Sequence, residues 1–194
     1  MIQNTGFNKQ IDPNKIKIGD VILFASGTKV TIRIQEKYGY GESSKWTHVA
    51  GSIGGYDLVE GQVPKSRTCN LQKDYVEKGI EIRVLRKKYW EKEKDKVKVA
   101  LWWAAMNNTP YDFPQLFNFL VGWFGFGNAY IAVHNLFDSH KKLICSELII
   151  NGFFKQNYNL FDKPAWNVLP ADYNNTDLFD IITDIWVEAK EKEL

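Results

Sequence analysis

The chain has 194 residues, of which 44% are hydrophobic, and this is enough to build the core of a single domain. Its 25 lysines and arginines nearly balance 23 aspartates and glutamates, so the net charge of +2 gives no indication of a nucleic-acid partner. The 2 cysteines are too few for a disulfide framework and form no CxxC pair or Cys/His cluster of the zinc-binding type. We therefore expect one domain over residues 1–194, without a metal or an organic cofactor.

The start of the chain gives an expectation about location. Residues 1–8 contain neither the cationic segment nor the apolar segment of a signal peptide. We expect a cytoplasmic protein, which would reach the cell wall only by lysis or by another export route.

Strand patterns come first along the chain. Residues 21–24 are a short apolar run typical of a buried strand, and the alternation over 30–34 favours a second strand. The polar, glycine-rich residues 35–45 predict a mobile loop. Residues 47–53 and 56–60 predict a hairpin, because Gly54-Gly55 separates them.

The later chain alternates between strand and helix patterns. Residues 79–85 and 181–187 predict strands, whereas 92–107 and 143–154 have the spacing of helices. The helix over 143–154 is apolar around most of its circumference, which indicates a central, buried position. This order predicts an α+β fold, with a small antiparallel sheet or partial barrel packed on a central helix.

One uncharged stretch allows more than one interpretation. Residues 113–133 are strongly apolar and long enough to span a bilayer, but Pro114, Gln115, Asn118 and three glycines interrupt them. We expect a buried or pocket-lining segment. A weak membrane or lipid contact through residues 116–131 is the alternative.

Cys145 stands in the first turn of the predicted helix 143–154. A thiolate there faces backbone N–H groups that have no helical acceptor, together with the positive end of the helix dipole, and both stabilise the anion. The same N–H groups, that of Ser146 among them, can form an oxyanion hole when sulfur attacks a carbonyl. The alternative is a buried structural cysteine.

His48 and Glu60 are the candidate partners of this thiol. His48 shares one face of its predicted strand with small residues, which leaves room for a partner; the alternative is an edge-strand histidine bonded to water. A three-residue loop over 53–55 would place Glu60 directly across from His48, where it could orient the imidazole. A two-residue loop would instead place Glu60 opposite Val49, on the other face.

Six segments occur in an order that matches a known family. They are residues 19–24, 47–50 with His48, Glu60, 111–113, 144–149 with Cys145, and 169–172. In this order the chain resembles the circularly permuted, NlpC-type branch of the papain-like cysteine hydrolases, whose relatives include lecithin retinol acyltransferase. The permuted branch has histidine, acid and cysteine in this succession, whereas papain has its cysteine first.

The resemblance implies a permuted papain-like fold and a role for each matched residue. Cys145 would be the nucleophile, His48 the general base and Glu60 the residue that orients the base. Tyr111 and Ser146 would contribute to substrate binding or to the oxyanion site, although a half-buried core aromatic is the alternative for Tyr111. The implied activity is that of a cysteine amidase or peptidase, which cleaves peptidoglycan-like peptides through an acyl-enzyme.

Two other functions stay open at this point. A lipid or acyl-ester hydrolase or acyltransferase would use residues 113–133 as an acyl tunnel, and a catalytically silent binding module would keep the fold alone. The remaining candidates are weak. His134 and His140 lie on different helical faces and do not predict a metal pair, and Cys69 is interpreted as an incidental thiol in a polar loop. The sequence gives no oligomeric state.

Overall fold

The computed structural model describes residues 9–110, 144–174 and 177–188. The strands are β1 (Lys9–Ile11), β2 (Val21–Phe24), β3 (His48–Gly54), β4 (Asp57–Glu60), β5 (Arg67–Asn70), β6 (Ile82–Lys87), β7 (Phe179–Ile182) and β8 (Trp186–Glu188). The helices are α1 (Lys29–Lys37), α2 (Glu93–Ala105), α5 (Cys145–Phe154) and α6 (Pro170–Asn174), with 3-10 turns at Gly41–Lys45 and Ala165–Asn167 and a π-helical turn at Gln72–Val76.

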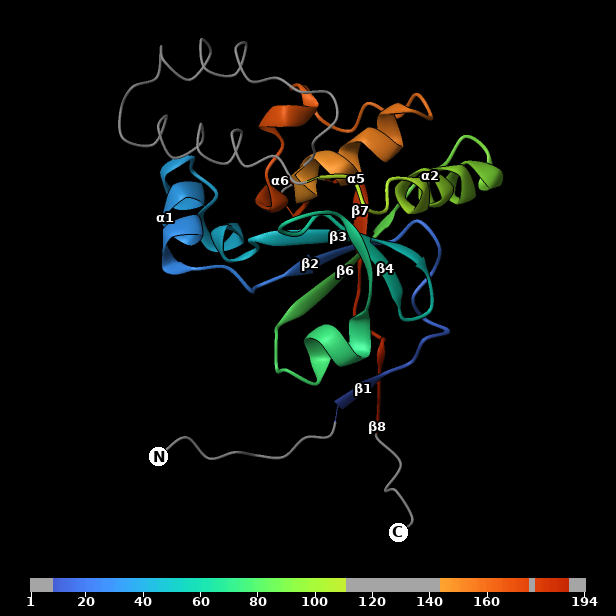
Figure 1. The fold of residues 1–194 in the computed structure, drawn as a ribbon, viewed down its shortest axis with the longest axis horizontal. Helices are drawn as coiled ribbons and strands as arrows, with labels where there is room; N and C mark the ends of the chain where they lie inside the picture. Colours follow the sequence, from blue (N-terminus) through green and yellow to red (C-terminus); the bar gives the residue numbers. More distant parts are fainter. Residues whose placement is uncertain (1–8, 111–143, 175–176, 189–194) are drawn as a thin grey trace.

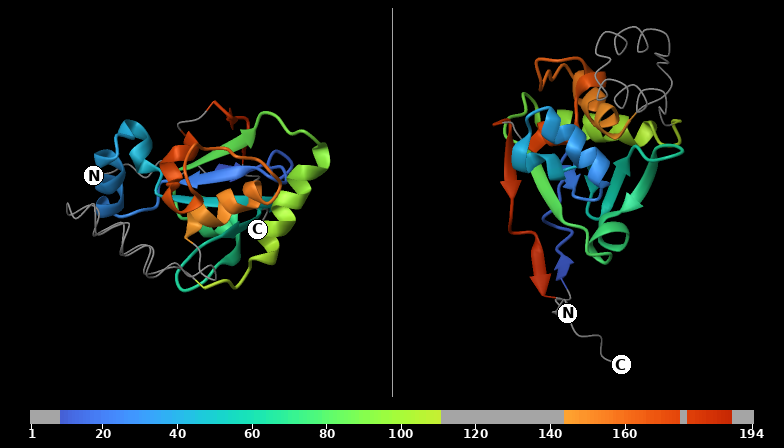
Figure 2. Two further views of the ribbon diagram at one scale, coloured as in Figure 1. Left: turned by 90° about the horizontal axis from the view of Figure 1, so that it is seen from above. Right: turned by 90° about the vertical axis from the view of Figure 1, so that its left-hand side faces the viewer.

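Six strands form one antiparallel sheet in the order β5-β4-β3-β2-β6-β7, while β1 and β8 pair in a separate two-stranded sheet. Helices α2 and α5 lie over one face of the large sheet (Figure 1). A second direction of view shows β1 and β8 extending away from that sheet (Figure 2). The fold is therefore α+β, and among the described residues the sheet is open, with β5 and β7 at its edges.

Strand β2, in the middle of the sheet, is buried on both faces, because each face has its own core. In β2, Val21 and Leu23 pack with the helices, whereas Ile22 and Phe24 pack with residues from β5 and the π-helical turn on the far side. An apolar run without alternation is the pattern that burial on two faces requires. The prediction of a buried strand at 21–24 is confirmed.

The indole of Trp103 joins α2, α5 and the sheet. Its Nε1 donates to the Ile149 carbonyl at 3.1 Å, and the side chain is fully buried. A Cβ on Gly51 of β3 or on Gly152 of α5 would lie 2.3 Å or 2.2 Å from indole atoms. These two glycines leave the space that lets the ring insert, so they fix how closely the helices approach the sheet.

The strand expected at 30–34 is wrong, because these residues belong to α1. Five alternating residues are too few to separate a strand from a helix, and Thr28 favours the helix: its Oγ1 accepts the Thr31 N–H at 3.4 Å. The loop expected over 35–45 is found only at residues 38–40, between α1 and the 3-10 turn Gly41–Lys45. The buried Gln35 amide donates to the carbonyls of Ser44 and Trp46, and Gln35 Oε1 accepts from Ala171 N–H, which fixes this segment against α6.

Three further boundaries differ from the sequence pattern. The strand expected at 79–85 runs over Ile82–Lys87, and residues 181–187 contribute to two strands, β7 and β8, in different sheets. Cys69 lies in strand β5 and is buried, so its assignment to a polar loop is wrong. Polar residues occur in β5 because it is the edge strand, where one side of the backbone is unpaired within the sheet.

Candidate active site

Three chain segments meet where β3 begins, β4 ends and α5 begins. His48 is the first residue of β3, Glu60 the last of β4 and Cys145 the first of α5. Gly61 makes this meeting close: a Cβ on Gly61 would lie 2.9 Å from both the N and the Cα of Cys145. Only a glycine therefore fits between the end of β4 and the N-terminus of α5.

The hairpin brings His48 and Glu60 together in a register that neither expected loop gives. Glu60 pairs with Ala50, Ser52 with Leu58 and Gly54 with Asp57, with an irregularity between Ser52 and Gly54. Both expected alignments of Glu60, opposite His48 and opposite Val49, are wrong. The face is nevertheless the shared one, because His48 lies two residues from Ala50 and side chains alternate along a strand.

From this diagonal position the Glu60 carboxylate reaches the imidazole. His48 Nε2 and Glu60 Oε2 are 2.7 Å apart. The carboxylate is fully buried, whereas the imidazole retains 16% of its exposure. A diagonal neighbour on the same face of a strand pair is within reach of a long side chain, so the contact does not need the direct pairing.

Glu60 has two additional donors that the sequence analysis missed. Arg67 Nε on β5 donates to Oε1 at 2.8 Å, and the Tyr75 hydroxyl of the π-helical turn donates to Oε2. Burial favours the neutral carboxyl, but the hydrogen bond and charge of His48, then the hydrogen bonds of Tyr75 and Arg67, outweigh it and lower the pKa of Glu60 to about 2. Glu60 is therefore a buried carboxylate whose charge is compensated on three sides.

The imidazole is coupled to the thiol as well as to the carboxylate. Burial alone lowers the pKa of His48, but the charge and hydrogen bond of Cys145, followed by those of Glu60, raise it to about 10. Since Nε2 faces Glu60, Nδ1 is the ring nitrogen left for Cys145. The His48 ring also packs against Phe24, with centroids 5.6 Å apart, and Phe24 stacks on Tyr75 at 3.9 Å. The aromatic contacts hold the imidazole between acid and thiol.

The first turn of α5 supplies the backbone groups expected for an anion. Ile144 caps the helix without a side-chain hydrogen bond, and the first helical bond runs from Leu148 N–H to the Ile144 carbonyl. The N–H groups of Cys145 and Ser146 therefore have no acceptor within the helix. The Ser146 side chain is fully buried, and its Oγ has no hydrogen-bond partner among the described residues.

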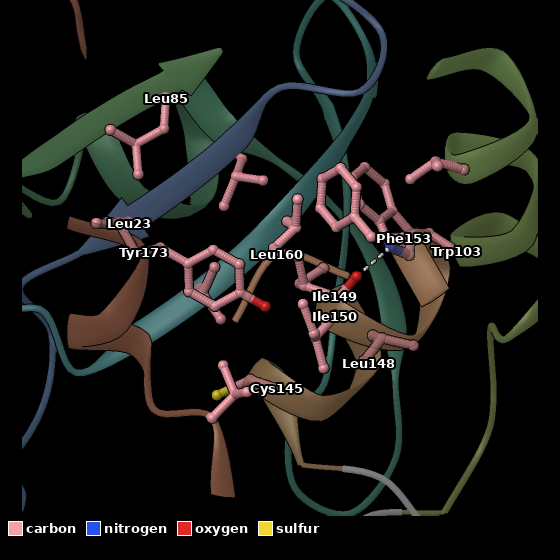
Figure 3. Close-up of a cluster of buried hydrophobic side chains, with 14 of the residues drawn as sticks. Leu23, Leu85, Trp103, Cys145, Leu148, Ile149, Ile150, Phe153, Leu160 and Tyr173 are labelled. Carbon is pink, nitrogen blue, oxygen red and sulfur yellow. Dashed lines mark hydrogen bonds between the residues drawn. The ribbon is translucent and has the colours of Figure 1, made fainter. Parts of the chain in front are cut away.

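Figure 3 shows Cys145 at the margin of the helix-side core, next to Tyr173 of α6. The buried Tyr173 hydroxyl donates to the Ser146 carbonyl at 3.0 Å. Cys145 is 7% exposed. The start of α5 is thus fixed from α6 as well as from Gly61.

Three residues of the site, Gly61, Arg67 and Tyr75, were missed in the sequence analysis, and they differ in whether the sequence carries a signal for them. Gly61 follows the candidate acid directly, and a glycine at a strand end is a sign of close backbone approach. Arg67 and Tyr75 had no local signal, because only the pairing of β4 with β5 and the π-helical turn bring them to Glu60.

Some residues to which the sequence analysis assigned roles lie outside the described residues. Tyr111 and residues 116–131 are among them, so their suggested roles stay predictions. In the part of the chain that the structure describes, no group of three or more His, Cys, Asp and Glu side chains is arranged to hold a metal ion. No helix within the described ranges is long and apolar enough to cross a membrane.

The fold and the site define the chain as an α+β protein with a cysteine, a histidine and a carboxylate gathered at the end of an antiparallel sheet. No family model matches the sequence, and no curated protein matches it. The chain is similar in structure to the metalloprotein YiiX from Escherichia coli O157:H7, described as DUF1105. The TM-score is 0.56 at 15% identity, over 87% of this chain and 97% of that one. At this identity the likeness concerns the fold alone.

Proposed function

We propose that the protein is a cysteine hydrolase with a permuted papain-like fold, in which Cys145 is the nucleophile, His48 the base and Glu60 the residue that orients the base. The observation that supports this most is the coupling of Cys145 to an imidazole whose other nitrogen lies 2.7 Å from a buried carboxylate. A nucleophile, a base and a group that orients the base are the parts that acyl transfer by a thiol requires.

The proposed reaction begins with the thiolate–imidazolium pair of Cys145 and His48. Sulfur attacks a carbonyl carbon, a C–S bond forms, and the oxyanion accepts hydrogen bonds from N–H groups at the start of α5. His48 gives its proton to the leaving nitrogen as the C–N bond breaks, which leaves an acyl-enzyme and a neutral imidazole. Neutral His48 then removes a proton from water, hydroxide attacks the thioester, and sulfur departs as the thiolate.

The proposed substrate class is an amide in peptidoglycan-like peptides. This assignment rests on the family resemblance, which spans roughly residues 18–173. The lipid-ester alternative depends on residues 113–133, which lie outside the described residues, and it becomes an outcome of the test. The silent binding module is a second such outcome.

The experiment is to trap and weigh the acyl-enzyme. The protein is incubated separately with peptidoglycan fragments and with a lipid extract, quenched in acid and digested, and the peptide that contains Cys145 is examined by mass spectrometry. A peptidyl adduct on Cys145 supports the proposed amidase activity. A fatty-acyl adduct on Cys145 would instead show that the protein is a lipid or acyl-ester hydrolase or acyltransferase. The Cys69→Ser variant is the control and should keep the adduct.

Thiol reactivity separates the hydrolase from the silent module. Iodoacetamide at pH 6.5 should alkylate Cys145 at least about tenfold faster than Cys69, because a thiolate paired with an imidazolium is present at this pH. His48→Ala should remove the difference. Equal, slow labelling of both thiols in the wild type would exclude an activated nucleophile and support the silent module.

A further inference from the structure

A pocket of about 340 Å³ lies at the other end of the large sheet, among residues that the proposed hydrolase does not use. The pairing of β2 with β3 and β6 shows where the pocket lies relative to His48. Val21, the first residue of β2, pairs with Gly51 and Leu85, whereas Phe24, the last, pairs with His48. The residues next to Val21 and Leu85, Asp20 and Arg86, line the pocket. Three strand steps separate the two ends of β2, which is about 10 Å.

Cationic side chains exceed carboxylates around this pocket. The cationic side chains are those of Lys17, Arg86, Lys87, Lys88 and Lys96, and the carboxylates are those of Asp20 and Glu93. Five positive charges less two negative charges leave a surplus of three. Low-dielectric walls around a hollow with charges of one sign concentrate their field, so this place attracts anions more strongly than scattered surface lysines do.

The two carboxylates are already engaged by two of the cations. Asp20 is buried and accepts from Arg86 Nε at 2.9 Å and from Arg86 Nη2 at 2.8 Å. Glu93 pairs with Lys96 on the first turn of α2. The surplus charge therefore belongs to the remaining lysines, Lys17, Lys87 and Lys88.

These three lysines differ in how far neighbouring groups compensate the positive charge of their ammonium groups. Lys17 and Lys88 are exposed, and the Lys88 ammonium lies 4.0 Å from an Asp180 carboxylate, the outer limit of an ion pair. Lys87 is buried: its ammonium donates to the Tyr89 carbonyl and lies 5.3 Å from the centre of the Trp90 ring. Burial lowers the pKa of Lys87, and the charge of the Glu91 carboxylate opposes this shift.

The wall of the pocket is close-packed and partly aromatic. A Cβ on Gly19 would lie 3.0 Å from Lys96 Cβ and 3.5 Å from a Trp90 ring carbon, and Gly19 has a φ of +85° that favours glycine. The glycine therefore lets the backbone, the lysine stem and the indole meet at one wall. An indole beside ammonium groups suits an anion attached to an apolar or planar group.

We propose that this pocket binds a phosphate-type oxyanion, either as free phosphate or as the phosphoryl group of a small organic molecule. A surplus of three positive charges matches a multivalent anion better than a single carboxylate. Lysine ammonium groups bind phosphate as point charges, without the fixed fork that a planar carboxylate selects in arginine. This binding is independent of the Cys145 reaction and needs none of its residues.

Isothermal titration calorimetry of the whole chain at constant ionic strength tests the proposal, with inorganic phosphate, pyrophosphate and phenyl phosphate as probes and acetate as the singly charged comparison. We expect saturable binding of at least one phosphate probe and weaker binding of acetate. The Lys17→Gln/Lys88→Gln variant should weaken the phosphate probe about tenfold, because it removes two of the three lysine charges that the carboxylates lining the pocket do not balance.

The matched control is Lys73→Gln/Lys155→Gln, which removes the same charge from two exposed lysines outside the pocket. It should leave the dissociation constant within about twofold. Phenyl phosphate binding more tightly than phosphate identifies an organic phosphate, and the reverse order identifies the free ion; both support the site. No saturable binding of any phosphate probe, or equal weakening in both double variants, would overturn it. Acyl-adduct formation on Cys145 is measured in parallel and reports separately on the hydrolase.

Discussion

The two cysteines have the same burial and opposite electrostatic surroundings. Cys69 on β5 and Cys145 on α5 are each 7% exposed. Cys145 is coupled to the His48 imidazole, which can hold a proton and a positive charge. Cys69 lies beside Glu60, and burial followed by the charge of this carboxylate raises the pKa of the Cys69 thiol far above its ordinary value.

A single carboxylate therefore acts on the surroundings of both thiols. Glu60 raises the pKa of the His48 imidazole, to which Cys145 is coupled, whereas its negative charge opposes ionisation of the Cys69 thiol. The comparison teaches that equal exposure is no basis for expecting equal reactivity. We expect the ionised groups beside each thiol to decide how fast it reacts.

The largest expected effect concerns the two thiols themselves. Cys145→Ser should reduce hydrolysis of peptidoglycan fragments by at least about 10³-fold, because the hydroxyl is a far weaker nucleophile in a site arranged for a thiolate. Cys69→Ser should stay within about threefold of the wild type. Release of amino groups over time measures both. A large loss of hydrolysis in the Cys69→Ser variant would show that the different surroundings of the two cysteines do not identify the nucleophile.

Glu60→Gln should lower kcat/KM by about 10²- to 10⁴-fold, because the amide no longer stabilises the imidazolium or fixes its tautomer. The pKa of His48 should fall from its raised value, which NMR titration of the ring proton measures directly. Circular dichroism confirms that the variant folds. An unchanged ring titration would contradict the electrostatic role of Glu60.

Gly61→Ala should reduce the reactivity of Cys145 specifically. The added Cβ would lie 2.9 Å from Cys145 backbone atoms, so α5 must shift, and we expect a tenfold or greater loss of Cys145 alkylation, about the effect of a misplaced catalytic group. Gly51→Ala is the control, since its Cβ meets Trp103 and destabilises the fold away from the thiol. Equal alkylation losses in both variants, measured on folded protein, would remove any special role for Gly61.

The pH dependence of stability should report the raised pKa of His48. The protonated ring contributes fully below its ordinary value of 6.5, and the contribution is lost as pH rises through about 10. The lowered pKa of Glu60 gives a contribution that is complete above 4.5 and lost as pH falls towards 2. The difference in unfolding free energy between wild type and His48→Ala should therefore be larger at pH 6 than at pH 9. Urea unfolding at both values measures it, and a difference that grows with pH would contradict the charged pair.

The smallest effect is expected from Arg67→Gln. The guanidinium side chain is 48% exposed, so solvent screens much of its attraction for Glu60. We expect a loss of activity of about two- to fivefold that decreases at high salt. Kinetics at two salt concentrations check this. A loss as large as that of Glu60→Gln would mean that Arg67 acts on the substrate and not through the carboxylate.

The sequence by itself determined the elements around the site, because their signals are local. The apolar run at 21–24, the glycine pair that ends β3 and the apolar circumference of α5 depend only on neighbouring residues, and all three elements are found. The position of Cys145 at the start of α5 follows from the same pattern. The succession of strands and helices was likewise enough for the α+β class.

Only the tertiary structure decided which side chains come into contact at the site. The irregularity between Ser52 and Gly54 sets Glu60 opposite Ala50, and no turn rule distinguishes that register from the alternatives in advance. The approach of Cys69 and Arg67 to Glu60 depends on the pairing of β4 with β5, an edge strand whose own residues are mostly polar. Segment 30–34 belongs to helix α1, and the hydrogen bonds of Gln35 at the end of that helix reach Ser44, Trp46 and Ala171, far along the chain. Local sequence fixes backbone preference, but contacts between distant segments depend on a register and a packing that no short stretch of sequence contains.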